Sequence, residues 1–515
     1  MHKVCKVVFN SVSHDARVLK EAKAVKESGF DVTIIGIQDA NNNTPIEITE
    51  NGIVIRRAAW ISRANKPLWL IYTIGVMITI SVGAIMSAYG SRMLLFARST
   101  FDKLNPYSIY LVILSTVAFI ICFLLFRKYK LNLERYNRIK TNERNLSLKF
   151  DSIFEAHKAS TGGNFRSRTP KKKVYSFSSC VCWRPLMGGA FSLLNHSTRR
   201  KWRAVFARES SVYKILKDEN PKIVHAHDLT ALPVCSRYKS KYKSKLIFDA
   251  HEIYDHLAQA SDIIAANNSK VLSKYSRHVD HFITINRSIS NYYRKFYRRL
   301  PPALIIKNAT LPTPKFKYDG RLHNAAGLNP DKKILIYQGG FAPNRGLINL
   351  VLSSEFLNDE WAIIFMGWGK LEDELKRVAK SLFLKKPTTV DCIKFLPKVN
   401  QNELPYWTAG ATVGIIPYEN TGLNHWYCNP NKLWEYPNAN VPILVSPFPE
   451  LRSYIEKHSI GWLLDDPITP QNIAEVVNSL SDQEINLASS RCKHFIEKDN
   501  WNVYSQVIKD LYKKI

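Results

Sequence analysis

The chain has 515 residues, of which 45 % are hydrophobic and 23 % are charged. This balance is typical of folded domains and excludes a disordered protein, and the length allows more than one domain with its own core. The formal net charge of +30 favours anionic partners such as nucleic acid, anionic lipid or anionic substrates. Among the eight cysteines only Cys180 and Cys182 are closely spaced, so a zinc site is not predicted.

The N-terminal residues predict a β-α-β unit. Residues 3–9 form an apolar run typical of a buried strand, residues 15–28 have helical periodicity, and residues 31–37 form the next strand. A further strand is predicted over residues 52–56. This alternation indicates a doubly wound parallel sheet, which binds ligands at the carboxyl ends of its strands. Arg17, early in the helix, could hold an acceptor phosphate or be a solvated surface charge.

Two long uncharged segments then interrupt the α/β pattern. Residues 68–89 and 107–126 contain no charged side chain, and each has about 20 residues, roughly enough to cross a 30 Å hydrocarbon layer. A pair of buried core helices is the alternative, which two such runs in succession disfavour. We predict a two-helix transmembrane hairpin over residues 67–127, and a shallow re-entrant hairpin would also fit.

A strongly basic segment follows the predicted hairpin. Residues 127–203 contain 19 basic and 4 acidic residues, a net charge of +15. The flanks of the hairpin are more basic than its connecting loop, which favours both large soluble parts on the cytoplasmic side of an inner membrane. Behind a hairpin, such charge favours anionic lipid headgroups or a lipid-linked phosphate. Because no zinc-finger, bZIP or RRM signature accompanies the charge, nucleic acid is not an expected partner.

The α/β pattern resumes after this basic insertion, which we place at residues 128–205. A basic helix is predicted over residues 198–217. The next predicted strands cover residues 222–225, 246–248, 282–286 and 304–308. His225, His227 and His251 lie at the ends of the first two of these strands, where a doubly wound sheet exposes its ligand groups. A metal site needs converging ligands, and none is expected here.

A polar stretch with three prolines, residues 312–330, is predicted to link two domains. A second alternation of strands and helices follows it. Its predicted strands cover residues 333–337, 361–366, 393–396, 411–417 and 441–446. The expected fold is therefore α/β, with Rossmann-like domains at residues 1–310 and 311–494 and a terminal helix at residues 495–515 that returns to the first domain.

Residues 424–436 lie between the last two predicted strands. A helix beginning at Asn429 and Pro430 would have Asn as its N-cap and Pro as its first residue, a favoured combination. The free N–H groups of such a helix start suit a phosphate. Glu435, more than one turn later, is placed to accept hydrogen bonds from sugar hydroxyls. The alternative is a capped helix with an incidental glutamate.

The motif Pro430-Asn-Lys-Leu-Trp-Glu-Tyr436, followed by Val441-Pro-Ile-Leu444, resembles the nucleotide-sugar site of glycosyltransferase family 4. These are retaining transferases of the GT-B fold, and many carry two glutamates eight positions apart. Glu435 matches the second, which contacts the donor ribose, whereas Tyr427 stands at the position of the first. The resemblance extends over residues 3–56 and 201–515 through further motifs at residues 13–17, 225–228, 249–252, 339–346, 367–369, 395–397 and 449–451.

The resemblance implies roles for individual residues. Arg345 matches a basic residue that faces the donor diphosphate, and the glycines before it would let the backbone approach the phosphates. A second basic residue that some members carry near Gly340 is absent. Leu396 and Pro397 match the edge that packs on the base. The implied donor-binding residues are Gly339, Gly340, Arg345, Leu396, Pro397, Asn431, Lys432 and Glu435.

His251 matches a histidine of the first domain that faces the transferred sugar, although a capping or supporting histidine is the alternative. Together with Glu435 and Arg345 it forms the implied catalytic set. The expected acceptor-side residues are His14, Arg17 and His227.

The implied activity is that of a retaining hexosyltransferase that uses a nucleotide-sugar donor without a metal or other cofactor. The expected acceptor is a lipid-linked or other glycan at the cytoplasmic membrane face, in polysaccharide or glycolipid biosynthesis. A nucleotide-sugar epimerase of the same fold is one alternative. A non-catalytic membrane scaffold, with Tyr427 marking a decayed donor site, is another, and a nucleic-acid-binding protein would rest on charge alone.

Overall fold

The computed structural model describes residues 2–13, 15–39, 42, 44–59, 209–258, 260–385 and 392–515. Its two sheets belong to one compact unit, formed by Met1–Ser62 and Ser197–Ile515. The hairpin predicted at residues 67–127 lies outside the described residues, as does the whole basic insertion at residues 128–205. In the part of the chain that is described, no helix is both long and apolar enough to cross a membrane.

The first sheet has eight strands in the order β3-β4-β2-β1-β5-β6-β7-β8. All neighbours run parallel except β3, which pairs antiparallel with β4. The strands are β1 (Lys3–Val7), β2 (Asp31–Ile37), β3 (Ile46–Ile48), β4 (Val54–Ala58), β5 (Ile223–His227), β6 (Lys245–Ala250), β7 (His281–Thr284) and β8 (Ala303–Ile305). The predicted doubly wound sheet is confirmed. Strand β3, whose three residues are all exposed, was not predicted, because an Ile-Glu-Ile segment is too short to show a strand period.

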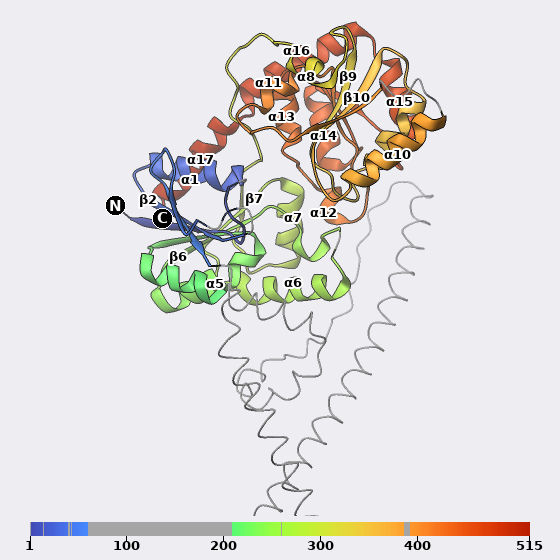
Figure 1. Ribbon diagram of the computed structural model, residues 1–515. Coiled ribbons are helices and arrows are strands. Elements are labelled where there is room, and N and C mark those ends of the chain that lie inside the picture. Colours follow the sequence, from blue (N-terminus) through green and yellow to red (C-terminus); the bar gives the residue numbers. More distant parts are fainter. Residues whose placement is uncertain are drawn as a thin grey trace, which may run out of the picture. The chain divides into compact units, whose positions relative to one another are not determined.

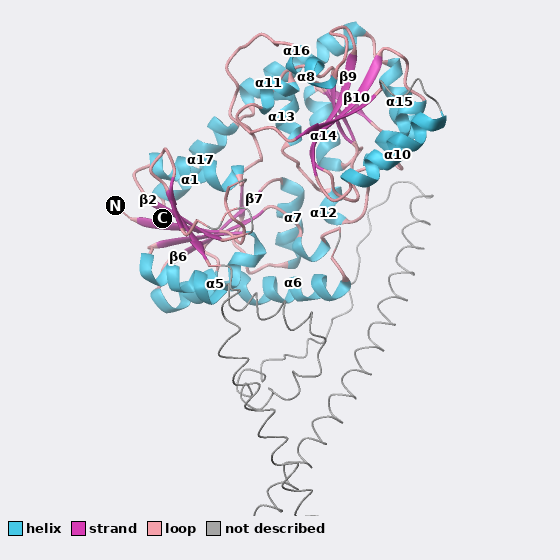
Figure 2. Ribbon diagram, viewed as in Figure 1, coloured by secondary structure: helices cyan, strands magenta, loops and turns pink. Residues whose placement is uncertain are grey.

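Helices cover both faces of this sheet (Figures 1 and 2). On one face, apolar side chains of α1 (Ala16–Glu27) and α17 (Trp501–Lys513) pack on β1 and β2. On the other face, the sheet packs against apolar side chains of α5 (Asp228–Tyr242), α6 (Asp262–Tyr275) and α7 (Arg287–Phe296). Burial on both faces explains why these strands are continuous apolar runs. We call this sheet with its helices the N-terminal domain.

The second sheet is wholly parallel, with the order β11-β10-β9-β12-β13-β14. We call it, with its own helices, the C-terminal domain. Its strands are β9 (Lys333–Gly340), β10 (Trp361–Trp368), β11 (Ile393–Pro397), β12 (Val413–Ile416), β13 (Ile443–Val445) and β14 (Gly461–Leu463). Its helices include α8 (Arg321–Ala326), α9 (Leu347–Leu352), α10 (Glu372–Lys385), α11 (Leu404–Thr408), α12 (Leu423–Trp426), α13 (Lys432–Asn438), α14 (Pro449–His458), α15 (Pro470–Ser479) and α16 (Asp482–Lys498). Helix α8 lies inside the stretch predicted as a linker, so the connection is shorter than expected.

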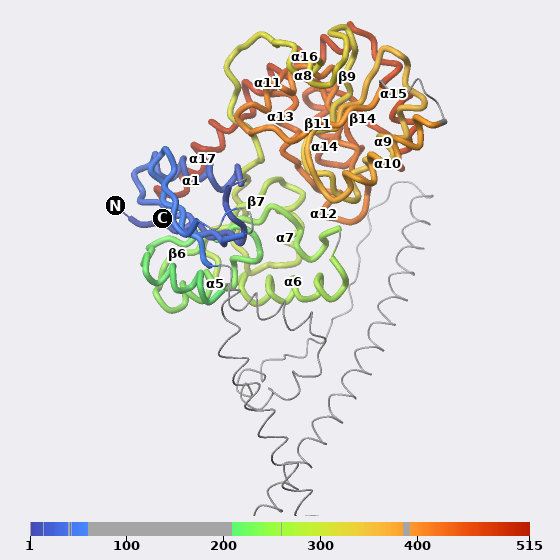
Figure 3. The backbone as a smooth tube through the Cα atoms, in the orientation of Figure 1, coloured from blue at the N-terminus to red at the C-terminus, as the bar shows by residue number. Residues whose placement is uncertain are grey.

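The C-terminal residues form parts of two helices rather than the single helix that was predicted. Helix α16 ends at Lys498 and α17 begins at Trp501, with Asn500 as its N-cap: the Asn500 side-chain oxygen accepts a hydrogen bond of 2.9 Å from the Asn502 N–H. Figure 3 shows this last segment beside the N-terminal part of the chain. An ion pair of 2.7 Å between Lys509 and Glu27 joins α17 to α1, so the end of the chain returns to the N-terminal domain.

Candidate functional site

Three neighbouring strands of the second sheet end in a side-chain-poor edge. Gly339 of β9 is in register with Gly367 of β10, which is in register with Pro397 of β11. A Cβ on Gly367 would lie 1.9 Å from the Gly339 carbonyl oxygen, and Gly339 has φ +113°, a conformation that favours glycine. The two residues predicted to pack on a base lie at this edge. Leu396 is partly exposed and Pro397 is exposed. A ligand could therefore approach the backbone here.

Two cations lie beside this edge. The Lys432 ammonium is 3.5 Å from the Tyr418 hydroxyl and 4.9 Å from the centre of the Tyr337 ring. Arg345 also donates to the Tyr418 hydroxyl, and its guanidinium carbon is 4.8 Å from that ring's centre. A Cβ on Gly339 would be 3.1 Å from the Lys432 nitrogen. Lys432 thus supplies a second positive charge next to Arg345, although the sequence offered none near Gly340.

The charge on these two cations is not neutralised by a close carboxylate. Among the described residues, neither Arg345 nor Lys432 forms an ion pair with an acidic side chain within 4.0 Å. Burial, with the Arg345 charge adding to it, lowers the pKa of Lys432 to about 7, against a partial opposing effect of Glu435. An incoming anion would therefore meet one permanent cation and one ammonium that readily regains its proton.

Glu435 is held by two amide groups. Its carboxylate accepts hydrogen bonds from the Gln338 side chain at 3.2 Å and from the Gln401 side chain at 3.4 Å. Gln338 is itself oriented by the Thr408 hydroxyl, which donates to its side-chain oxygen at 2.8 Å. The Glu435 side chain is half-buried. This arrangement leaves an oriented carboxylate that can accept hydrogen bonds from a ligand's hydroxyl groups.

The helix carrying Lys432 and Glu435 begins later than predicted. Helix α13 starts at Lys432, after Asn431, rather than at Asn429 and Pro430. The Leu433 N–H donates to the Pro430 carbonyl at 3.0 Å, so the chain makes a tight turn before the helix. The exposed Asn431 side chain forms no cap hydrogen bond. The expected Asn cap is therefore wrong.

Helix α12 and the residue that follows it contact the N-terminal domain. The Ile253 N–H donates to the Asn424 side chain at 2.7 Å, and the Asn286 side chain donates to the Tyr427 carbonyl at 2.7 Å. The Tyr427 ring packs against apolar residues of the N-terminal domain. The position at which many family 4 members carry their first glutamate is thus used here for a contact between the domains.

On the N-terminal domain, His251 follows β6 and lies between two carboxylates. Its Nε2 is 2.7 Å from an Asp249 oxygen, and its Nδ1 is 3.4 Å from an Asp228 oxygen. Burial alone would lower the pKa of His251, but the Asp249 carboxylate outweighs it and the pKa is raised. Its side chain is 19 % exposed. His251 is therefore a histidine of raised pKa that a ligand can reach.

Asp249 is the centre of the contacts beneath His251. Arg17 binds it with two N–H groups, at 3.0 Å and 3.1 Å, and His227 Nδ1 lies 3.3 Å from the same carboxylate. Burial opposes ionisation of Asp249, but the Arg17 charge and then the His251 charge overcome it and hold its pKa well below the usual value. Arg17 and His227, predicted on the acceptor side, are both buried. They lie under the site rather than on its surface.

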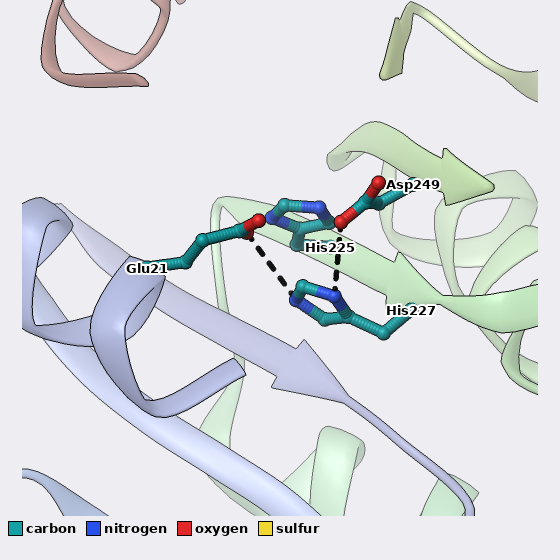
Figure 4. A group of neighbouring side chains, drawn as sticks. All are labelled: Glu21, His225, His227 and Asp249. Carbon is teal, nitrogen blue, oxygen red and sulfur yellow. Dashed lines mark ion pairs between the residues drawn. The ribbon is translucent and has the colours of Figure 1, made fainter. Parts of the chain in front are cut away.

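A cluster of four buried side chains lies deeper in the same region, and Figure 4 shows it. Side-chain ligand atoms of four buried residues lie within 4.8 Å of one another, a geometry that could suit a metal ion; the residues are Glu21, His225, His227 and Asp249. The Lys6 ammonium, however, is 3.0 Å from Glu21, 2.9 Å from His225 Nδ1 and 3.4 Å from His227 Nε2. Two internal basic side chains thus already face the two carboxylates of the cluster, because Arg17 lies 3.1 Å from Glu21 and 3.0 Å from Asp249.

Sequence reasoning found the strand ends but missed several of these residues. His14 lies outside the described residues. Asp249 could have been noticed, because it opens the motif that contains His251, and Lys6 is a lone charge between apolar residues of its strand. The residues that were not predicted are Lys6, Glu21, Asp228, Asp249, Gln338, Tyr418 and Asn424.

Comparisons with known proteins agree with the two-domain arrangement. Residues 320–499 match the family model "Glycosyl transferases group 1", and residues 180–309 match "Glycosyltransferase Family 4". No curated protein sequence matches the chain significantly.

Solved structures share the fold at low sequence identity. Sucrose-phosphate synthase from Thermosynechococcus elongatus has a TM-score of 0.60 at 10 % identity, covering 100 % of this chain and 99 % of that chain. The N-terminal domain of Candida albicans trehalose-6-phosphate phosphatase has a TM-score of 0.56 at 11 % identity, covering 100 % and 97 %. A glycosyltransferase from Rickettsia africae ESF-5 has a TM-score of 0.55 at 9 % identity, covering 100 % and 98 %. At such identities the likeness concerns the α/β, GT-B-like fold alone.

Proposed function

We propose that this protein, which carries a group 1 glycosyl transferase domain over residues 320–499, moves a sugar from a nucleotide-sugar donor to an acceptor hydroxyl. The observation that carries the proposal is the pair of cations, Arg345 and Lys432, beside the glycine edge at Gly339. A diphosphate is the kind of ligand that such a site suits, because it brings at least two negative charges and accepts hydrogen bonds from exposed backbone N–H groups.

The same pair supports transfer as well as binding. When the bond between the sugar and the diphosphate breaks, negative charge builds up on the departing phosphate oxygen. Positive groups placed there beforehand stabilise that charge more than they stabilise the intact donor. Glu435, oriented by Gln338 and Gln401, accepts hydrogen bonds from ribose hydroxyls. In the retaining course implied by the resemblance to family 4, the acceptor hydroxyl attacks on the face that the phosphate leaves and gives that phosphate its proton.

Thermal unfolding of the full-length protein with UDP, GDP or ADP tests the donor site. Ligand that binds only the native state raises the unfolding temperature, so one of these diphosphates should raise it while the corresponding monophosphate does so less. If none of the diphosphates shifts unfolding at millimolar concentration, the donor site is refuted. The protein is then incubated with sugar conjugates of the nucleotide that binds, in the absence of an acceptor. An epimerase would convert such a donor to another nucleotide sugar, whereas a transferase needs the acceptor.

His251→Ala should lower turnover about ten- to a hundred-fold with little change in nucleotide affinity. His251 is reachable at the strand end of the N-terminal domain, whereas both cations of the donor site belong to the C-terminal domain. Steady-state kinetics and nucleotide titration measure the two effects separately. The control is His278→Ala, which should behave as wild type. His278 precedes β7, at the edge of the same sheet opposite to the edge where His251 lies. Weaker nucleotide binding with unchanged turnover in His251→Ala would contradict this role.

We further propose that the acceptor is lipid-linked and that residues 68–126 hold the protein at the membrane. The support is the pair of uncharged segments, the net charge of +15 in the next 77 residues, and the attraction of about 1 kcal/mol per basic residue that an anionic surface provides. Deleting residues 68–126 should leave nucleotide binding nearly unchanged and abolish transfer to a long-chain lipid acceptor in vesicles. A short-chain, water-soluble analogue of that acceptor should still be glycosylated. Equal activity of the deletion variant on both acceptors would refute the membrane role.

A further inference from the structure

We propose that Lys6 and His227 are positioning residues for His251, because they fix a single arrangement of hydrogen bonds that holds the Asp249 carboxylate against the His251 ring. The inference rests on the proposed function, in which His251 faces the transferred sugar. It concerns a property of the protein without ligand, so it can be tested without any sugar transfer.

The hydrogen-bonding capacity of Lys6 sets the direction of the first contacts. An ammonium has three N–H donors and no acceptor. The three groups around it are a Glu21 oxygen at 3.0 Å, His225 Nδ1 at 2.9 Å and His227 Nε2 at 3.4 Å. Burial lowers the pKa of Lys6, but the Glu21 carboxylate opposes that fall. With the ammonium donating to all three, His227 Nε2 must accept and carries no proton.

The proton of His227 is therefore on Nδ1, which faces Asp249. A neutral imidazole has one donor and one acceptor nitrogen, and His227 Nδ1 lies 3.3 Å from the Asp249 oxygen Oδ2. The same oxygen is 3.0 Å from Arg17 Nε and 2.7 Å from His251 Nε2. The Asp249 oxygen Oδ2 thus accepts hydrogen bonds from Arg17 and His251 and is in ion-pair contact with His227, so groups on α1, β5 and the loop after β6 surround it.

The surroundings shift the pKa values of His225 and His251 in opposite directions. The pKa of His225 is lowered well below its usual value, first by burial and next by the Lys6 charge. Its ring stacks on that of His227 with 4.1 Å between ring centres. The charged or titratable groups that face His251 are Arg17 from α1, His227 from β5, Asp228 from α5, Asp249 from β6 and the neighbouring Glu252.

This arrangement predicts that a change at buried Lys6 alters the titration of His251. In Lys6→Met, His227 should take up the missing positive charge, because its Nε2 lies 3.8 Å from the Glu21 carboxylate. The His227 and His251 ring centres are 6.1 Å apart, so the new charge disfavours protonation of His251. The pKa of His251 should fall by about one unit. NMR titration of the full-length protein measures it, with the His251 signal identified by its loss in His251→Gln.

Two further variants separate this charge effect from a loss of structure. Lys6→Gln keeps a hydrogen-bonding side chain and should produce the same fall, which covers the case in which Lys6→Met does not fold. Lys6→Met combined with Glu21→Gln removes one positive and one negative charge, so the net charge around His227 equals that of wild type. The pKa of His251 should then return close to the wild-type value. Lys3→Met is the matched control, because Lys3 lies on the same strand and pairs with Glu219 at 2.9 Å but is 35 % exposed.

An unchanged pKa of His251 in Lys6→Gln or Lys6→Met would overturn the proposal, as would a fall of equal size in the double variant. The first result would mean that Lys6 only stabilises the fold, and the second would mean that the altered packing, not the charge, disturbs His251. Neither result depends on transfer activity. A wild-type protein that binds no nucleotide would instead refute the proposed function and leave this titration experiment valid.

Discussion

Arg345→Ala should weaken nucleoside diphosphate binding about ten- to a hundred-fold, since a hydrogen bond to a charged group contributes about 1.5–3 kcal/mol. Arg345 is the permanent cation of the donor site, and among the described residues no acidic side chain neutralises it by an ion pair within 4.0 Å. The transfer rate should fall at least as much as the affinity, because the leaving phosphate also loses this cation. Calorimetric titration measures the affinity for the nucleoside diphosphate, and steady-state kinetics measures the transfer rate.

A matched control for this substitution is Arg452→Ala. Arg452 lies on α14 of the same domain. Its side chain is 46 % exposed and forms a surface ion pair of 3.4 Å with Glu456. The control should bind the diphosphate as wild type does. Equal affinities of Arg345→Ala and Arg452→Ala would remove Arg345 from the donor site.

Lys432 adds a pH dependence to the same measurement. Its pKa is lowered to about 7 in the free protein, so below that pH the ammonium is charged before the diphosphate arrives. Above it, binding must be accompanied by uptake of a proton, and the apparent affinity should fall as the pH rises. Arg345→Ala removes a charge that lowers this pKa, so the fall should begin at a higher pH in the variant.

Asp249→Asn should destabilise the N-terminal domain by about 3–5 kcal/mol at neutral pH, the cost of removing one partner from a buried ion pair. The substitution leaves Arg17 buried without its bidentate carboxylate and deprives His251 of its closest anion. The midpoint of chemical unfolding at a series of pH values measures the loss. Asp319→Asn is the control: Asp319 pairs with Arg321 at the surface, and its removal should leave the midpoint nearly unchanged.

The pH dependence of this loss follows from both shifted groups. The depressed pKa of Asp249 stabilises the fold above the unfolded-state pKa of about 3.9, and this contribution is lost as the pH falls. The raised pKa of His251 stabilises the fold below the unfolded-state value of about 6.5 and is lost as the pH rises through the folded-state pKa. The difference between wild type and Asp249→Asn should therefore be largest between about pH 4 and 6.5. A difference that is independent of pH would mean that packing rather than charge is responsible.

The strands of both sheets could be predicted because most are buried on two faces and appear as apolar runs. The strands that were missed, β3 and β14, have three residues each and are exposed or half-buried, so they carry little signal. The predicted single terminal helix failed at Asn500, whose role as an N-cap depends on a hydrogen bond to Asn502. A polar residue inside an apolar helical pattern does not by itself predict that one helix ends and another begins there.

The exposed part of the site could be predicted from motifs at strand ends, but its buried support could not. Lys6 looks like an interruption in an apolar strand, and its partners Glu21 and His225 stand 15 and 219 positions further along the chain. Only the folded arrangement brings the three together. In the same way, Lys432 approaches Gly339 because β9 and α13 are neighbours in space, and this contact supplies a cation that the residues around Gly340 lack.

The most direct measurement is the fate of a labelled sugar. Purified full-length protein in vesicles is given a nucleotide sugar carrying radiolabel in the sugar, together with a membrane lipid extract as acceptor. The account predicts that label moves into the lipid or glycan fraction, that one nucleoside diphosphate is released for each sugar transferred, and that Arg345→Ala suppresses both. Two results would contradict the proposed transfer. In the first, the label stays on the nucleotide as a different sugar. In the second, the protein neither binds nor consumes any of the UDP, GDP and ADP sugars.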